Sequence, residues 1–140
     1  MICRDVSGSV LNCMAAYFGI KDALYAEVKA AILAVDLACK KCLNSVWLEL
    51  DSAITVDLFN GNGLVPWKLI NDWRRCSRLL NTINCKITHI FREGNQCADR
   101  LANYAIKSKL LSTWDYAPSF ILKPLNRNRL GILSYRFSNL

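Results

Sequence analysis

The stretch VWLELDSAITV, Val46–Val56, ends an apolar strand in carboxylates just where a second apolar run begins. Side chains along a strand alternate between two faces. Trp47, Glu49 and Asp51 therefore share one face, and the aliphatic residues between them share the other. Asp51 lies at the C-terminal end of this predicted strand. That position allows two interpretations of its carboxylate, one structural and one chemical.

In the structural interpretation, Asp51 or Ser52 caps the short helix that Ala53 begins, because Asp and Ser are preferred N-cap residues. In the chemical interpretation, Asp51 is a metal-binding or catalytic group, since ligand sites in open α/β sheets gather at the carboxyl ends of strands. The stretch taken alone favours the cap. The placement of other carboxylates along the chain bears on the choice.

The composition indicates a single packed domain with an anionic partner. The chain has 140 residues, of which 53% are hydrophobic and 21% are charged, values typical of a globular protein rather than a disordered one. Its 18 Lys and Arg outnumber its 11 Asp and Glu, giving a net charge of +7. On charge alone, the partner is nucleic acid, an acidic membrane surface or an acidic protein.

The cysteines and the N-terminal residues predict an intracellular protein with reduced thiols, in the nucleus or the cytoplasm. Seven cysteines is an odd number, and the first ten residues lack the features of a secretory signal. Cys39 and Cys42 have the C-x-x-C spacing, but no second such pair follows, so we interpret them as helix residues rather than a zinc site. No apolar run reaches the ~18 residues of a membrane span.

Hydrophobic periodicity predicts alternating strands and helices. The expected elements are a hairpin over 1–17, a helix over Ala26–Cys42, a strand over Val46–Leu50, a helix over Ala53–Phe59, a helix from Pro66 to about Ile83, a strand over Lys86–Phe91 and a helix over Gln96–Lys107 capped by Asn95. The hairpin predicts antiparallel pairing, and strands separated by helices predict a parallel pair. The fold class is therefore mixed α/β.

Two further expectations concern the end of this pattern. Residues 1–107 are expected to form the domain, and residues 108–140, which are irregular and basic with Pro118 and Pro124, a C-terminal extension. His89 is expected to be a packed strand residue, because alternation places it with Ile87 and Phe91.

Two more carboxylates, Glu27 and Asp99, lie near the starts of predicted helices, where the helix dipole alone favours an anion. The runs around the three carboxylates are AEVKAAILAVDLA, VWLELDSAITV and THIFREGNQCADRLANYA. In this order they resemble the ribonuclease H-like domain of plant retrotransposon reverse transcriptases and their relatives. The resemblance covers residues 1–107 and implies a mixed sheet flanked by helices.

The resemblance also implies a chemistry. In the family, four carboxylates bind two Mg²⁺ ions that activate water to cut the RNA strand of an RNA/DNA hybrid, and Glu27, Asp51 and Asp99 match three of them. Mg²⁺ is a hard cation that prefers carboxylate oxygens and water, and two such ions stabilise the attacking and leaving oxygens of an in-line displacement. No small-molecule cofactor and no membrane partner are expected.

The fourth carboxylate, the family's first Asp, belongs to a strand that precedes the hairpin. This chain is expected to lack that strand, which in the family pairs with both the hairpin and the strand Val46–Leu50. Asp5 matches a hairpin-turn residue instead. The segment Ile132–Phe137 is an alternative occupant of the vacant place in the sheet.

The basic residues Lys68, Arg74, Arg75 and Arg78 occupy the region where some family members contact nucleic acid, and Ser52 adjoins the predicted metal ligand Asp51. We expect these five residues to bind nucleic acid, with a strong dependence on salt. The leading functional hypothesis is a ribonuclease H-type endonuclease for RNA/DNA hybrids, with activity reduced by the missing ligand. The alternatives are a non-catalytic nucleic-acid-binding domain and an inactive retroelement remnant.

Overall fold

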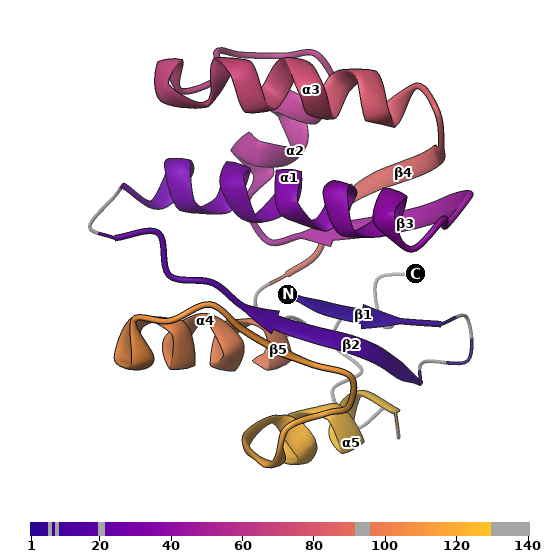
Figure 1. Cartoon of the computed structure of the whole chain (residues 1–140), viewed down its shortest axis with the longest axis vertical. Helices are drawn as coiled ribbons and strands as arrows, with labels where there is room; N and C mark the ends of the chain where they lie inside the picture. The colour runs from indigo at the N-terminus through magenta and orange to yellow at the C-terminus, as the bar shows by residue number, and fades with distance from the viewer. Residues whose placement is uncertain (6, 8, 20–21, 92–95, 130–140) are drawn as a thin grey trace. The chain divides into compact units, whose positions relative to one another are not determined.

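The computed structural model describes residues 1–5, 7, 9–19, 22–91 and 96–129, which form two compact units. One unit joins Met1–Gly19 to Phe91–Leu140, and the other is Ile20–Ile90 (Figure 1). Each unit has its own hydrophobic core. The predicted helix cap Asn95 and the segment Ile132–Phe137 lie outside the described residues.

The unit Ile20–Ile90 contains two strands and the longest helix of the described chain. In order, its elements are α1 (Ala23–Lys40), β3 (Ser45–Leu50), α2 (Ala53–Phe59), the 3-10 turn η1 (Trp67–Leu69), α3 (Ile70–Leu80) and β4 (Asn84–His89). Every helix and strand expected between residues 26 and 91 is present, with ends shifted by a few residues. Cys42 lies beyond the end of α1 with φ 55° and is exposed, which corrects its assignment to the helix.

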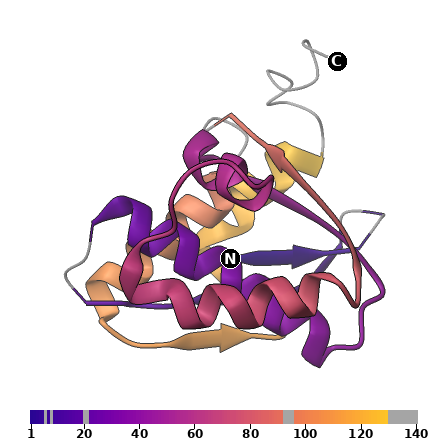
Figure 2. The ribbon, with the colours of Figure 1, turned by 90° about the horizontal axis from the view of Figure 1, so that it is seen from above.

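Helix α1 forms because an apolar stripe recurs at helical spacing after a good N-cap. The Asp22 side chain accepts a hydrogen bond from the backbone N–H of Tyr25 at 2.7 Å, and so satisfies one of the unpaired donors of the first turn. The stripe is fully buried: Val28, Ala31, Ile32, Val35 and Ala38. It packs with Leu69 and Cys76 from η1 and α3, so α1 and α3, the latter drawn as the rose helix in Figure 2, enclose the core of this unit.

Strands β3 and β4 pair in parallel over their whole length, from Ser45 opposite Asn84 to Leu50 opposite His89. This confirms the predicted parallel pair. The alternation of exposure along both strands also agrees with the period of two, since Trp47 and Lys86 are exposed whereas Val46 and Leu48 are half-buried. His89 is exposed, because it is the last residue of β4, and the expectation that it is packed was wrong.

The other unit contains the antiparallel part of the fold. Its elements are β1 (Ile2–Arg4), β2 (Val10–Ala15), α4 (Gln96–Ser108), β5 (Ser112–Trp114), the 3-10 turn η3 (Ser119–Ile121) and α5 (Leu122–Arg129). Strands β1 and β2 form the predicted hairpin, with a register shift between Cys3 and Arg4. Helix α4 lies against β2 and buries Cys97, Leu101 and Ala105.

The segment after α4 is more regular than its sequence suggests. Strand β5 pairs antiparallel with β2, opposite Cys13, Met14 and Ala15, so the sheet order is β1-β2-β5. Three aromatic rings pack together here: Tyr104 stacks on Phe120 with centroids 5.0 Å apart, and Trp114 meets both rings edge-on. Ile121 is completely buried in the same core. The segment therefore supplies core residues, although the domain boundary after residue 107 stays a prediction.

The mixed α/β class, with antiparallel and parallel strands flanked by helices, is confirmed. Within the described chain, the sheets β1-β2-β5 and β3-β4 are separate, and β1 and β3 each pair on one side only. None of the helices in the described part of the chain is long and apolar enough to cross a membrane.

Candidate metal and nucleic-acid site

Ser52, rather than Asp51, caps α2. The Ser52 Oγ atom accepts hydrogen bonds from the backbone N–H of Thr55 at 3.2 Å and from the Thr55 hydroxyl at 3.0 Å. The Asp51 carboxylate, half-buried at the carboxyl end of β3, makes no hydrogen bond or ion pair among the described residues. Of the two residues expected to cap this helix, only Ser52 does so. The Asp51 carboxylate is therefore available to a ligand.

Glu27 is connected to the same helix start. It lies in the second turn of α1, half-buried, and its Oε2 atom is 3.5 Å from the fully buried hydroxyl of Thr55. Thr55 thus contacts both Glu27 and Ser52, the residue that follows Asp51. Two of the three predicted carboxylates, Glu27 and Asp51, are consequently positioned within one unit by the β3–α2 junction and α1.

Asp99 belongs to the other unit. It lies in the first turn of α4 and is exposed, on the side of the helix opposite the buried residues Cys97, Leu101 and Ala105. In that position its charge stabilises the positive end of the helix dipole. Its expected role as a metal ligand stays a prediction.

The chemistry of these side chains fits one hydrated Mg²⁺ better than two. Mg²⁺ commonly binds through one or two carboxylates and completes its octahedron with water, and Glu27 and Asp51 supply two such groups. Among the residues that the structure describes, no three His, Cys, Asp or Glu side chains gather closely enough to hold a metal ion.

The basic residues of the predicted nucleic-acid surface divide into two groups. Arg74 and Arg78 are exposed one turn apart on α3 and make no ion pair within the described ranges. Lys68, on η1, is also exposed, and its Nζ atom lies 5.5 Å from the ring centroid of Trp67, which is 79% exposed. These three cations are open to a phosphate.

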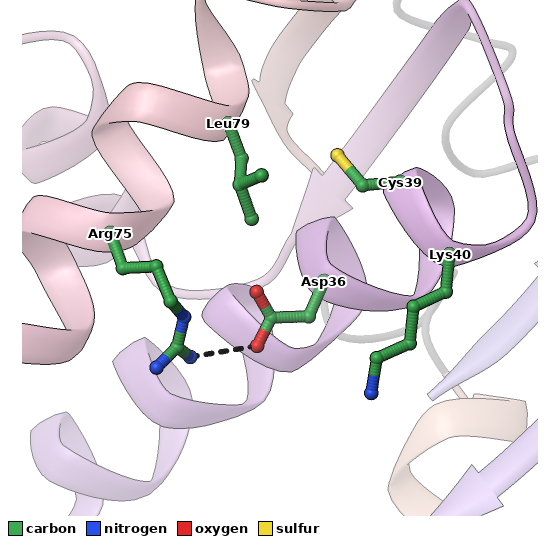
Figure 3. A pocket seen from close by; sticks show the side chains of 5 residues that line it. All are labelled: Asp36, Cys39, Lys40, Arg75 and Leu79. Carbon is green, nitrogen blue, oxygen red and sulfur yellow. Dashed lines mark hydrogen bonds and ion pairs between the residues drawn. The ribbon is translucent and has the colours of Figure 1, made fainter.

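Arg75, in contrast, is bound within the protein. Its guanidinium lies 2.8 Å from Asp36 on α1 and 3.1 Å from Asp72 on its own helix (Figure 3 shows the first contact). The hydrogen bond and charge of Asp36 raise the pKa of Arg75, and a hydrogen bond from Lys29 at 2.6 Å lowers the pKa of Asp72. Arg75 therefore joins α1 to α3, a role that its sequence position did not reveal.

The depression beside this ion pair is structural rather than a ligand site. It has a volume of about 470 Å³, and Figure 3 shows the Asp36–Arg75 pair among its lining side chains together with Cys39, Lys40 and Leu79. Two of its charged groups already neutralise each other. The buried thiol of Cys76 belongs to the core of this unit, and burial raises its pKa to about 12, so it is inert rather than nucleophilic.

Comparison with known proteins agrees with this architecture. The model of the family described as reverse transcriptase-like matches residues 1–105, three quarters of the chain. The chain therefore belongs to this family and contains its ribonuclease H-like domain, a nucleic-acid-binding domain. No curated protein and no solved structure matches the sequence.

Proposed function

We propose that this chain binds RNA/DNA hybrids and carries a reduced form of magnesium-dependent ribonuclease H activity, with Glu27 and Asp51 as metal ligands. The observation that supports this most strongly is the open carboxylate of Asp51. Ser52 alone caps α2, so the cap does not account for a carboxylate at the end of β3. Glu27 lies beside the same helix start, with its Oε2 atom 3.5 Å from the Thr55 hydroxyl.

In this proposal the residues act by position and charge. Glu27 and Asp51 hold the cation, Thr55 orients the Glu27 carboxylate, and the exposed cations Lys68, Arg74 and Arg78 bind phosphates. Ser52 donates its hydroxyl hydrogen to a phosphate, since that hydroxyl only accepts from Thr55. A bound Mg²⁺ would supply Lewis-acid stabilisation of the negative charge that develops on the phosphate oxygens during hydrolysis.

A second candidate is a nucleic-acid-binding domain without catalysis. It is favoured by the distribution of the carboxylates, because no group of three occurs in the described chain and three ligands hold two ions poorly. In either case we propose an origin in a retroelement of the plant type, supported by the three motifs, and a reducing compartment, supported by the odd number of seven cysteines.

The test is cleavage of the labelled RNA strand of an RNA/DNA hybrid with magnesium and with EDTA. Asp51→Asn removes the open carboxylate at nearly constant shape. Asp57→Asn is a matched control, because Asp57 is an exposed carboxylate on the same helix, α2. We expect slow magnesium-dependent cutting that Asp51→Asn abolishes and Asp57→Asn preserves. Salt-sensitive hybrid binding with no cutting selects the second candidate, and no binding rejects both.

A further inference from the structure

The outward face of the β3–β4 pair carries one aromatic ring among polar side chains. The period of two places Ser45, Trp47 and Glu49 of β3 on the same face as Asn84, Lys86 and Thr88 of β4. The opposite face carries the half-buried residues Val46, Leu48, Leu50, Cys85 and Ile87. Trp47 is therefore the only large apolar side chain on the outward face of the pair, and 60% of it is exposed.

The Trp47 ring is held in place although it is exposed. Its Nε1–H donates to the Thr88 hydroxyl at 2.7 Å, and the Lys86 ammonium lies 4.7 Å from its ring centroid. Both partners come from β4, so the indole bridges the two strands. A side chain fixed before binding loses little conformational freedom when a ligand stacks on it.

The charges on this face favour an anion at one end. Lys86 is exposed opposite Trp47, and beyond it the face continues with the uncharged pair Ser45 and Asn84, which hydrogen-bond each other at 3.2 Å. The carboxylates that share this face, Glu49 and Asp51, lie toward and just past the carboxyl end of β3. A phosphate placed between Lys86 and the Ser45–Asn84 pair therefore meets a cation and neutral polar groups.

We propose that this face, the Trp47 platform, binds a single-stranded stretch of nucleic acid by stacking a base on the Trp47 indole and placing a neighbouring phosphate near Lys86. An exposed aromatic ring beside a cation on a sheet surface is a general means of binding unpaired bases. The bases of a continuous duplex are already stacked on each other and do not compete for the ring. The inference extends the proposed function by adding a preference for substrates with an unpaired end.

The test compares two ligands by fluorescence anisotropy: a labelled oligothymidylate of about 15 nucleotides, near the upper end of known single-strand site sizes, and a blunt RNA/DNA hybrid. Trp47→Ala is expected to weaken oligothymidylate binding by roughly 5- to 100-fold, the range for loss of one stacked base. Trp47→Phe is expected to retain most of the affinity. Tyr116→Ala is the matched control, since Tyr116 is an aromatic residue that is 66% exposed on the other unit.

A second readout does not depend on the fold tolerating alanine. The indole N–H signal of Trp47 is identified in NMR spectra by its loss in Trp47→Phe, and we expect it to shift when oligothymidylate is added. Equal oligothymidylate affinity in Trp47→Ala and Tyr116→Ala, or an unmoved indole signal at saturation, overturns the inference and leaves the proposed function standing if the hybrid binds. Absence of binding to both ligands overturns both.

Discussion

The Ser52 side chain lies 3.2 Å from the backbone nitrogen of Thr55. This contact makes Ser52, and not its neighbour Asp51, the N-cap of α2. Ser52→Ala is expected to lower the free energy of unfolding by about 1 kcal/mol, the usual cost of a lost cap. Asp51→Asn is expected to change it by less than about 0.5 kcal/mol, as for a surface change without partners. Urea unfolding measures both values. A cost for Asp51→Asn as large as that for Ser52→Ala would show that Asp51 is structural.

The Lys29–Asp72 contact makes the free energy of unfolding depend on pH. The hydrogen bond from Lys29 lowers the pKa of Asp72 from its ordinary 3.8, so the unfolded chain binds this proton more readily than the folded one. The stabilisation from this contact is therefore complete above the pKa of Asp72 in the unfolded chain. It is lost as the pH falls through the pKa of Asp72 in the folded protein. We expect Asp72→Asn to cost roughly 0.5 to 1 kcal/mol at neutral pH, as for a partly exposed pair. The stabilities of the two proteins should converge as the pH falls well below 3.8, the ordinary pKa of Asp72; a constant difference would contradict this.

The cysteines should differ widely in reactivity. Burial raises the pKa of Cys76 to about 12, so near pH 8 only about one part in 10⁴ is thiolate. Cys42 is exposed. We expect iodoacetamide to modify Cys42 first and to leave Cys76 unmodified until the chain unfolds, as followed by mass spectrometry of peptides. Modification of Cys76 as fast as Cys42 in the folded protein would show that the α1–α3 core is open.

The segment after α4 should contribute to stability. Ile121 is completely buried against α4 and β2 residues, whereas its neighbour Leu122 is 43% exposed. Ile121→Ala is expected to cost about 2 to 4 kcal/mol, the range for a large-to-small change in a core. Leu122→Ala should cost less than about 1 kcal/mol. Equal effects of the two substitutions on thermal or urea unfolding would mean that this segment is a loose extension.

Substitutions of the three arginines of α3 should affect different properties, hybrid binding in two cases and stability in the third. Arg74→Ala and Arg78→Ala are each expected to weaken hybrid binding and to reduce the slope of log affinity against log salt by about one. Arg75→Ala is expected to leave that slope unchanged and to lower stability, because Arg75 bridges Asp36 and Asp72. A salt titration on each variant distinguishes them. The same slope loss in Arg75→Ala would show that its ion pairs open to phosphate.

The regular part of this fold follows from local pattern. The stripe Val28, Ala31, Ile32, Val35 and Ala38 predicts α1 because helical spacing places these five residues on one face, and all five are buried. The alternation around Trp47 and Glu49 predicts β3, and intervening helices predict its parallel pairing with β4. The hydrophobic periodicity of the sequence is sufficient to predict these elements.

The features that sequence reasoning missed depend on residues far apart in the chain. Asp36 and Arg75 are 39 residues apart, and no local pattern indicates their ion pair. Strand β5 is only three residues long, too short for a detectable period, and forms because β2 offers it an edge. The choice between Asp51 and Ser52 as cap also required coordinates, since both residue types are suited to the role.

The central claim is that Asp51 and Glu27 form a cation site, and paramagnetic Mn²⁺ in place of Mg²⁺ tests it directly because both ions prefer oxygen ligands. In NMR spectra of the wild-type chain, we expect low Mn²⁺ to broaden the amide signals around Asp51 and Glu27 first. Excess Mg²⁺ should reverse the broadening, and Asp51→Asn should prevent it while Asp57→Asn does not. Broadening that is uniform along the chain, or that persists unchanged in Asp51→Asn, would contradict the assignment of these carboxylates as metal ligands.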